Sequence, residues 1–248
     1  MALERRTFLS GLGGATAGTL LSGGLRHYAY AEGRTLRAAL TGFSVLNTLD
    51  PTKAAVNPEF YIIWGMFNTL VKLDADMKIS GDLAESWRNP DPTTWEFTLR
   101  QGVKFHDGTE LTAEDVVFTF ERIADEKFGS PVRKKMAPVR EVKALSSYVV
   151  QIKTDKPFAP LLTYLTNTRT STQIVCKKAV LAMGNEQYGR TPVGTGPWKL
   201  KEWRPNEKLI FEAHAGYFES GLPRASGLEV LLIKDDSSAI NALAASGL

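Results

Sequence analysis

The side chains that most often perform catalysis or bind metals are few in this sequence and lie far apart. Three histidines and one cysteine occur among its 248 residues. His106 stands beside an Asp107-Gly108 turn, His214 has no polar cluster around it, and His27 lies in a segment that we expect to be removed. Metal-binding histidines usually recur at short spacing, and the sequence offers no such pair. We therefore predict no metal site, and we assign His106 and Asp107 to turn formation rather than acid–base catalysis.

Motifs for nucleophilic catalysis and nucleotide binding are also missing. Cys176 follows the apolar pair Ile174-Val175 without a neighbouring histidine, which favours a buried structural thiol over a nucleophile. The sequence holds no P-loop, no G-x-S-x-G elbow, no H-E-x-x-H helix and no C-x-x-C pair. We therefore expect no catalytic residue, no cofactor and no enzyme activity.

The overall composition is that of a globular protein with little net charge. Hydrophobic residues make up 43% of the chain and charged residues 23%, and the net charge is +3. This balance excludes a mainly disordered or coiled-coil chain. It also argues against a protein that binds nucleic acid through phosphate neutralisation, so we expect no nucleic-acid partner.

The first 31 residues have the features of an export signal. Arg5-Arg6 precede an apolar stretch over residues 8–25, and small residues follow at Ala29-Tyr30-Ala31. The segment around the paired arginines resembles the twin-arginine export motif. Six glycines make the apolar stretch a poor helix, so we expect no stable membrane anchor. The pattern predicts a twin-arginine-type signal over residues 1–31, cleavage after Ala31 and a periplasmic location.

The rest of the chain alternates between strand and helix patterns. Apolar residues at spacings of three and four predict a helix over residues 59–73, and apolar–polar alternation predicts a strand over residues 95–99. Thr112 is the expected N-cap of a second helix, which should bury Val116, Val117, Phe120 and Ile123. Further strands are predicted over residues 35–40, 148–154 and 228–234, and a further helix over residues 236–246. The sequence thus predicts a mixed α/β chain.

Several motifs in this order resemble one known family. Residues 193–198, Val-Gly-Thr-Gly-Pro-Trp, resemble its G-T-G-P-aromatic turn, in which we expect a sharp bend rather than a phosphate-binding nest. The ordered combination is more specific than any single motif, and it identifies the chain over residues 35–248 as similar to the extracellular solute-binding proteins of family 5. The other matching segments are residues 81–87, 94–100, 101–109 and 111–116.

This resemblance implies a fold and a domain division. The expected fold is a periplasmic-binding-protein-like lobe of the α/β class, with a mixed β-sheet and an inserted α/β subdomain. Residues 32–51 and 191–248 would form the sheet domain, and residues 52–190 the inserted subdomain. Family members are roughly twice as long and have two lobes, so the resemblance implies a truncated chain with the second lobe largely missing. A single lobe would offer one wall of the cleft and should not bind solute tightly.

The resemblance also implies a function without bond making. The expected role is the periplasmic solute-binding component of an ABC importer, with a di- or oligopeptide as the small solute and the permease subunits as partners. Nickel complexes or another solute, and a noncatalytic sensor or chaperone role, remain alternatives. A secreted hydrolase would need a catalytic constellation, and the sequence offers none.

In the family, the segment between the first strand and the first helix lines the cleft. That segment corresponds here to Val56, Asn57, Phe60 and Tyr61. Asn57 has an alternative role as a helix cap. Phe60 and Tyr61 are about 100° apart on a helix, so at most one of them should face the cleft.

A second strip of the family's cleft corresponds to Thr168 and Arg169. The Arg169 guanidinium could pair with a ligand carboxylate through two hydrogen bonds. The alternatives are a surface arginine or a salt bridge between the lobes.

Overall fold

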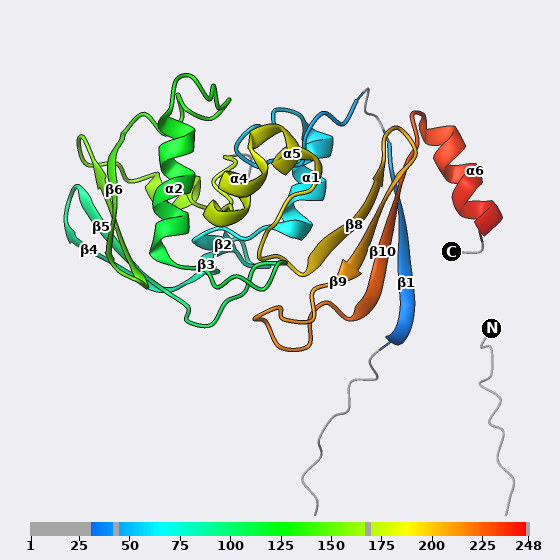
Figure 1. Cartoon of the computed structure of the whole chain (residues 1–248), viewed down its shortest axis with the longest axis horizontal. Helices are drawn as coiled ribbons and strands as arrows, with labels where there is room; N and C mark the ends of the chain where they lie inside the picture. Colours follow the sequence, from blue (N-terminus) through cyan, green and yellow to red (C-terminus); the bar gives the residue numbers. More distant parts are fainter. Residues whose placement is uncertain (1–30, 42–44, 167–169, 247–248) are drawn as a thin grey trace, which may run out of the picture.

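A mixed four-stranded sheet combines one strand from the N-terminal part of the chain with three strands from its C-terminal part. The computed structural model describes residues 31–41, 45–166 and 170–246. The strand order is β1-β10-β9-β8, with β1 (Ala31–Leu40) parallel to β10 (Ala225–Leu232) and the other neighbours antiparallel. β8 (Trp198–Arg204) and β9 (Lys208–Ala213) complete the sheet (Figure 1). This sheet confirms the predicted α/β fold, and its strands come from both sides of residues 52–190. The boundaries of the domains themselves stay a prediction.

A second four-stranded sheet lies at the other end of the molecule (Figure 1). Its order is β4-β5-β7-β6, and all neighbours are antiparallel. In β5, Phe97 and Leu99 are fully buried, as the alternation over residues 95–99 predicted. The strands are β4 (Ala84–Asp91), β5 (Thr94–Leu99), β6 (Val139–Ser146) and β7 (Val149–Thr154).

Helix α2 (Ala113–Ala124) packs against this second sheet and begins where the sequence predicted. The Asp115 carboxylate accepts the backbone N–H of Thr112 at 2.9 Å, so the first turn carries a capping box. Val116, Phe120 and Ile123 are buried, and Val117 is half-buried. The predicted apolar stripe is therefore confirmed.

The predicted helix over residues 59–73 is wrong in its second half. Helix α1 (Asn57–Met66) ends at Met66, Phe67 is extended, and β2 (Val71–Leu73) pairs with β3 (Ile79–Gly81). The helix ends because the Gly196 N–H donates to the Met66 carbonyl at 2.8 Å, and a distant loop thereby occupies the space of the next turn. Phe67, Leu70 and Val71 are buried nonetheless, so their apolar spacing also fits the loop and strand that form.

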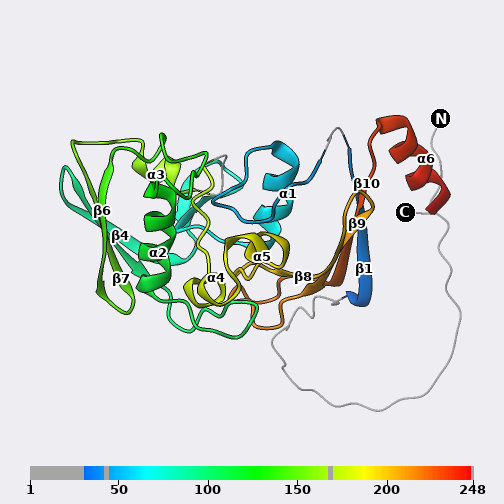
Figure 2. The same cartoon turned by 45° about the horizontal axis from the view of Figure 1, so that its top comes forward.

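Four helices complete the fold. α6 extends away from the other helices beside β1 and β10 (Figures 1 and 2), and its bounds match the predicted residues 236–246. The helices are α3 (Leu161–Tyr164), α4 (Lys177–Met183), α5 (Asn185–Arg190) and α6 (Asp236–Ser246).

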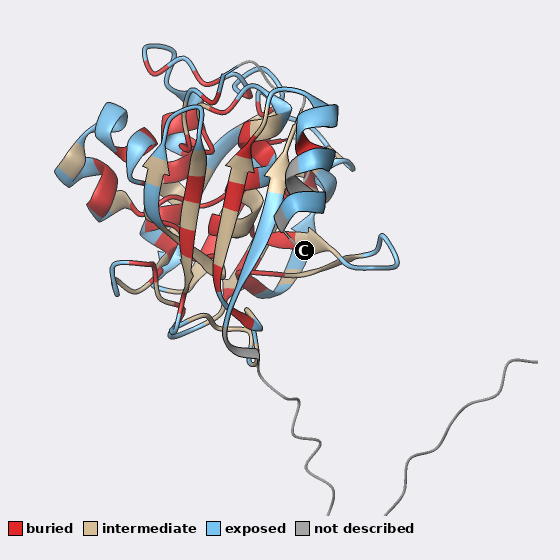
Figure 3. Ribbon diagram, turned by 90° about the vertical axis from the view of Figure 1, so that its right-hand side faces the viewer, coloured by how far each residue is buried: buried red, intermediate tan, exposed pale blue. Residues whose placement is uncertain are grey.

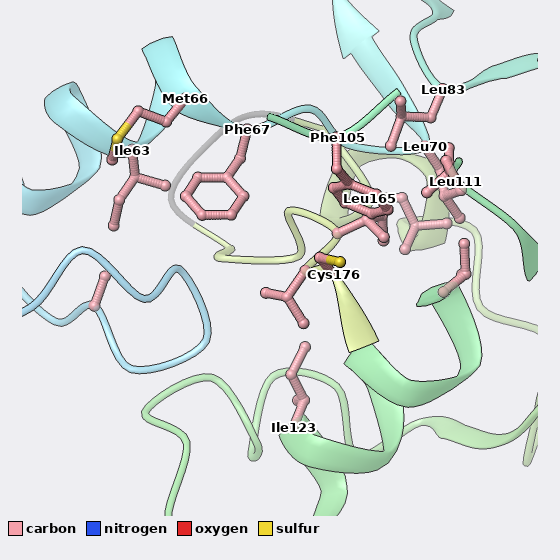
Figure 4. Close-up of a cluster of buried hydrophobic side chains, with 14 of the residues drawn as sticks. Ile63, Met66, Phe67, Leu70, Leu83, Phe105, Leu111, Ile123, Leu165 and Cys176 are labelled. Carbon is pink, nitrogen blue, oxygen red and sulfur yellow. The ribbon is translucent and has the colours of Figure 1, made fainter. Parts of the chain in front are cut away.

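The hydrophobic core runs between the two larger sheets. Residues of α1, α2 and the chain between them converge there with Cys176, which directly precedes α4 (Figure 4). Cys176 is fully buried, and burial raises the pKa of its thiol to about 11. The predicted structural thiol is thus confirmed. Buried residues alternate with half-buried ones in β9, and β10 also carries buried residues (Figure 3), so one face of the mixed sheet contributes Leu209, Phe211, Val230 and Leu232 to this core.

Candidate functional site

The structure brings together two histidines that the sequence places far apart. The rings of His106 and His214 lie 5.0 Å apart and nearly perpendicular, a contact that their spacing in the sequence did not indicate. His106 Nε2 and His214 Nδ1 both donate to the Gly196 carbonyl, at 3.0 and 3.2 Å. Burial lowers the pKa of His106 to about 4 and lowers that of His214 as well, so both rings are neutral at neutral pH. Among the described residues, no group of three or more His, Cys, Asp or Glu side chains could hold a metal ion.

The loop over residues 194–196 is a tight turn against α1. A Cβ atom on Gly194 would lie 2.0 Å from the Met66 carbonyl oxygen, and one on Gly196 would lie 2.4 Å from the Met66 carbonyl carbon. The Gly196 N–H donates to Met66, and the Gly194 N–H donates to His106 Nδ1 at 3.3 Å. These amides therefore have partners within the protein, as expected of a sharp bend and not of a phosphate-binding nest.

The predicted ligand-facing segment lies at the start of α1. Val56 precedes the helix and Asn57 is its first residue, but Asn57 does not cap it. The Glu59 carboxylate does so instead, because it accepts the backbone N–H groups of Ala55 at 2.8 Å and Val56 at 3.2 Å. Its other oxygen accepts the N–H of Asn47 at 3.1 Å. Glu59 thus holds the loop that follows β1 against the start of α1.

The exposed side of this helix start carries three of the predicted residues. Val56, Asn57 and Tyr61 are exposed, and the Tyr61 ring lies edge-on to Trp64 at 5.5 Å. Phe60 is only 8% exposed and belongs to the core, while Tyr61 is 51% exposed. Only one of the two rings is therefore exposed, and that Tyr61 faces a ligand cleft stays a prediction. Thr168 and Arg169 lie outside the described residues.

The chemistry of this surface is neutral. Val56 offers an apolar side chain, Asn57 an amide and Tyr61 a phenol, whereas the Glu59 carboxylate is buried and occupied by three backbone N–H groups. Such groups bind by van der Waals contact and uncharged hydrogen bonds.

Two hollows of about 420 and 500 Å³ lie elsewhere, one between α2 and β6 and one between His106, the segment after α5 and β8. The start of α1 is therefore an open wall and lines neither hollow.

A buried polar network escaped the sequence analysis. Asn68 donates to Asp82 at 2.8 Å and accepts the Thr195 hydroxyl at 3.0 Å. Asp82 also accepts the Thr69 N–H at 2.9 Å, and burial raises the pKa of its carboxyl to about 6. The only available signal was the Asn68-Thr69 pair just after the end of α1, and such a pair is too common to indicate a buried network.

The sequence profile described as "Bacterial extracellular solute-binding proteins, family 5 Middle" matches residues 78–248. Among curated relatives, the chain is 28% identical over 196 residues to the glutathione-binding protein GsiB of Escherichia coli K12, covering 79% of this chain and 38% of the relative. It is 28% identical over 216 residues to the periplasmic oligopeptide-binding protein OppA of Salmonella typhimurium, covering 80% and 39%. The chain thus spans about two fifths of the length of these curated relatives.

A solved structure of the binding protein AgaA, in complex with agropinic acid and from A. tumefaciens R10, shares the fold. Its TM-score is 0.80 at 27% identity, and the match covers 87% of this chain and 43% of that one. In the part of the chain that the structure describes, no helix is long and apolar enough to cross a membrane.

Proposed function

Since the chain belongs to the bacterial extracellular solute-binding proteins of family 5, we propose that it acts in the periplasm as part of the solute-binding component of an ABC importer, with short peptides as solute. The names of two relatives, one glutathione-binding and one oligopeptide-binding, support a peptide solute. The permease subunits of the importer would be its partners. Export by the twin-arginine route with cleavage after Ala31 belongs to the same proposal.

The observation that carries the proposal is the uncharged, exposed start of α1. A peptide presents amide N–H and carbonyl groups along its backbone, and the Asn57 amide and the Tyr61 hydroxyl can each donate to and accept from such groups. Val56 and the exposed part of Tyr61 add apolar contact for a side chain. Solute would lie on this wall, a second lobe would close over it by hinge motion, and no bond would be made or broken.

Nuclear magnetic resonance on the purified chain tests this proposal. Because one wall leaves a small solute half hydrated, we expect only weak binding, which chemical-shift changes detect where calorimetry does not. Di-, tri- and tetrapeptides should shift the backbone signals of Val56, Asn57 and Tyr61, and the Tyr61→Ala variant should lose most of the response. A matched Tyr148→Ala variant, in the turn between β6 and β7, should keep it. Peptides that shift no signal of the α1 start would refute the assignment of this wall.

A solute other than a peptide is the second candidate. The similarity to AgaA, whose structure contains agropinic acid, supports it. The same titration separates the two classes, because agropinic acid or a nickel complex would then shift the α1 signals where peptides do not.

A further inference from the structure

Three segments from distant parts of the sequence meet at the carbonyl group of Gly196. His106 comes from the turn after β5, Gly196 from the loop before β8, and His214 from the residue directly after β9. Both rings donate to this one oxygen, at 3.0 and 3.2 Å. The His106 backbone N–H also donates to the Gly194 carbonyl at 2.9 Å. The two histidines thereby hold the loop over residues 194–196 against the end of α1.

This arrangement requires a neutral His106. Its Nδ1 accepts the Gly194 N–H at 3.3 Å, so its proton is on Nε2. A second proton would go to Nδ1, where it would face the Gly194 N–H and abolish that hydrogen bond.

The basic groups around His106 oppose the second proton as well. The Lys199 ammonium faces it from β8, and His214, from the segment after β9, repels it once His214 is itself protonated. Asp107 is the acidic group nearby, but it lies in an exposed turn, where water weakens its effect. Neither ring is exposed: His106 is 7% and His214 8% accessible to solvent.

We propose that His106, His214 and residues 194–196 form an acid-sensitive clasp, which is closed at neutral pH and releases the loop from α1 when His106 takes up a second proton. The clasp lies where the mixed sheet meets the rest of the molecule, because β8 begins two residues after Gly196. Its opening would free the Met66 carbonyl and loosen this junction. The proposal does not depend on which solute is bound.

The direction of the pH dependence follows from the depressed pKa. The closed clasp holds the pKa of His106 near 4, whereas the released ring would titrate near 6.5. The open form therefore binds more protons below pH 6.5, and the closed form is progressively lost as the pH falls from 6.5 towards 4. The equilibrium constant for opening should rise about 30-fold between pH 7.5 and pH 5.0.

A local measurement is needed because another buried group works in the opposite direction. Asp82 touches Asn68, which holds Thr195, and burial raises the pKa of Asp82 from 3.8 to about 6. Protonation of Asp82 in the folded chain therefore adds stability as the pH falls through 6. A global unfolding curve would mix the two effects.

Amide hydrogen exchange on the whole chain, corrected for the intrinsic effect of pH, provides that measurement. Protection of the Gly194, Gly196 and His106 amides should fall by about 30-fold between pH 7.5 and pH 5.0, while that of Phe97 in the second sheet should not. In the His106→Asn variant, the new amide oxygen can accept the Gly194 N–H but cannot titrate, so the fall should shrink to less than about 3-fold. Equal protection at both pH values, or a variant that responds like the native chain, would overturn the proposal.

A titration of the histidine ring signals in the native chain keeps the test independent of how the variant folds. His106 should stay neutral, with its proton on Nε2, at pH 5.5, and should become charged only nearer pH 4, after the protection of the Gly194 amide has already fallen. A His106 ring that becomes charged near pH 6.5 while the clasp amides remain protected would refute the clasp.

Discussion

Removing the Arg122 guanidinium should destabilise the fold more than any surface change in this chain. Arg122 lies on α2 and is 7% exposed at its side chain, and its partner Asp50 is 1% exposed. Arg122 Nη2 donates to Asp50 Oδ2 at 2.7 Å and to Asn185 Oδ1 at 2.8 Å, and Nη1 donates to the Thr52 hydroxyl at 2.8 Å. The ring of Phe128 lies 4.3 Å from the guanidinium carbon. One side chain thus joins the loop after β1, helix α2 and helix α5.

The expected magnitude follows from what each substitution leaves behind. Arg122→Met keeps most of the aliphatic volume but leaves the Asp50 carboxylate buried without its cation, which costs about 3–5 kcal/mol. Asp50→Asn leaves the guanidinium buried and costs a similar amount, about 3–5 kcal/mol. In the double variant no buried charge is left unpaired. Its loss of stability should therefore be about 2–3 kcal/mol smaller than the sum of the losses in the two single variants.

Chemical denaturation of the native chain, the two single variants and the double variant at pH 7 measures this difference. The exposed pair Arg133–Glu126, at 3.4 Å, is the matched control, and its cycle should give less than about 1 kcal/mol. If the Arg122 and Asp50 costs simply add, or if either single variant loses less than about 1 kcal/mol, the reasoning that this ion pair joins three elements is refuted.

Three further predictions concern packing, backbone and export. Phe97→Ala, at a fully buried site, should cost about 3–5 kcal/mol in denaturant unfolding, whereas Leu145→Ala, at a residue that is 48% exposed, should cost less than about 0.5 kcal/mol; similar costs would mean that β5 does not contribute to the core. Met77 has a φ of 61° and is 72% exposed. Met77→Gly should relieve the left-handed backbone and stabilise the chain by about 0.5–1 kcal/mol, a net value that includes the greater freedom of glycine in the unfolded state. A loss of stability would contradict the left-handed backbone at this turn. Replacing Arg5 and Arg6 together by lysine should retain the precursor inside the cell, and an unchanged periplasmic yield, measured by fractionation, would remove the twin-arginine route.

The sequence predicts elements well where one local pattern decides them. In α2, the Thr112 cap, the acidic first turn and the apolar stripe all agree, and the helix forms as predicted. In β5, the apolar–polar alternation predicts a strand with one buried face, and β5 forms such a strand, paired with β7. Residues 67–71 fail because their apolar spacing fits a helix as well as a buried loop and strand, and only a tertiary contact decides between them.

The candidate site shows the same limit. Helix geometry sets Phe60 and Tyr61 about 100° apart, so the sequence could state that at most one of them would face the cleft, but not that Phe60 would be the buried one. It could not show that Glu59, rather than Asn57, caps α1, because the alternative acceptor depends on where the loop at Asn47 lies. Nor could it show the meeting of His106 with His214, since neither residue belongs to a periodic pattern and 107 positions separate them in the printed sequence.

Both ends of α1 are held by contacts that the helix itself does not contain. At its start, Glu59 ties it to the loop that leaves β1, and at its end the Gly196 N–H ties the Met66 carbonyl to the loop that enters β8. β1 and β8 are the two edge strands of the mixed sheet, so the two loops that hold α1 lead to opposite edges of that sheet. Tyr61 follows Glu59 by two residues and precedes Met66 by five, so it lies nearer the first attachment. The wall on which we place the solute is therefore positioned by the sheet, and loosening the clasp at Gly196 should disturb that wall from the end of the helix farthest from the solute.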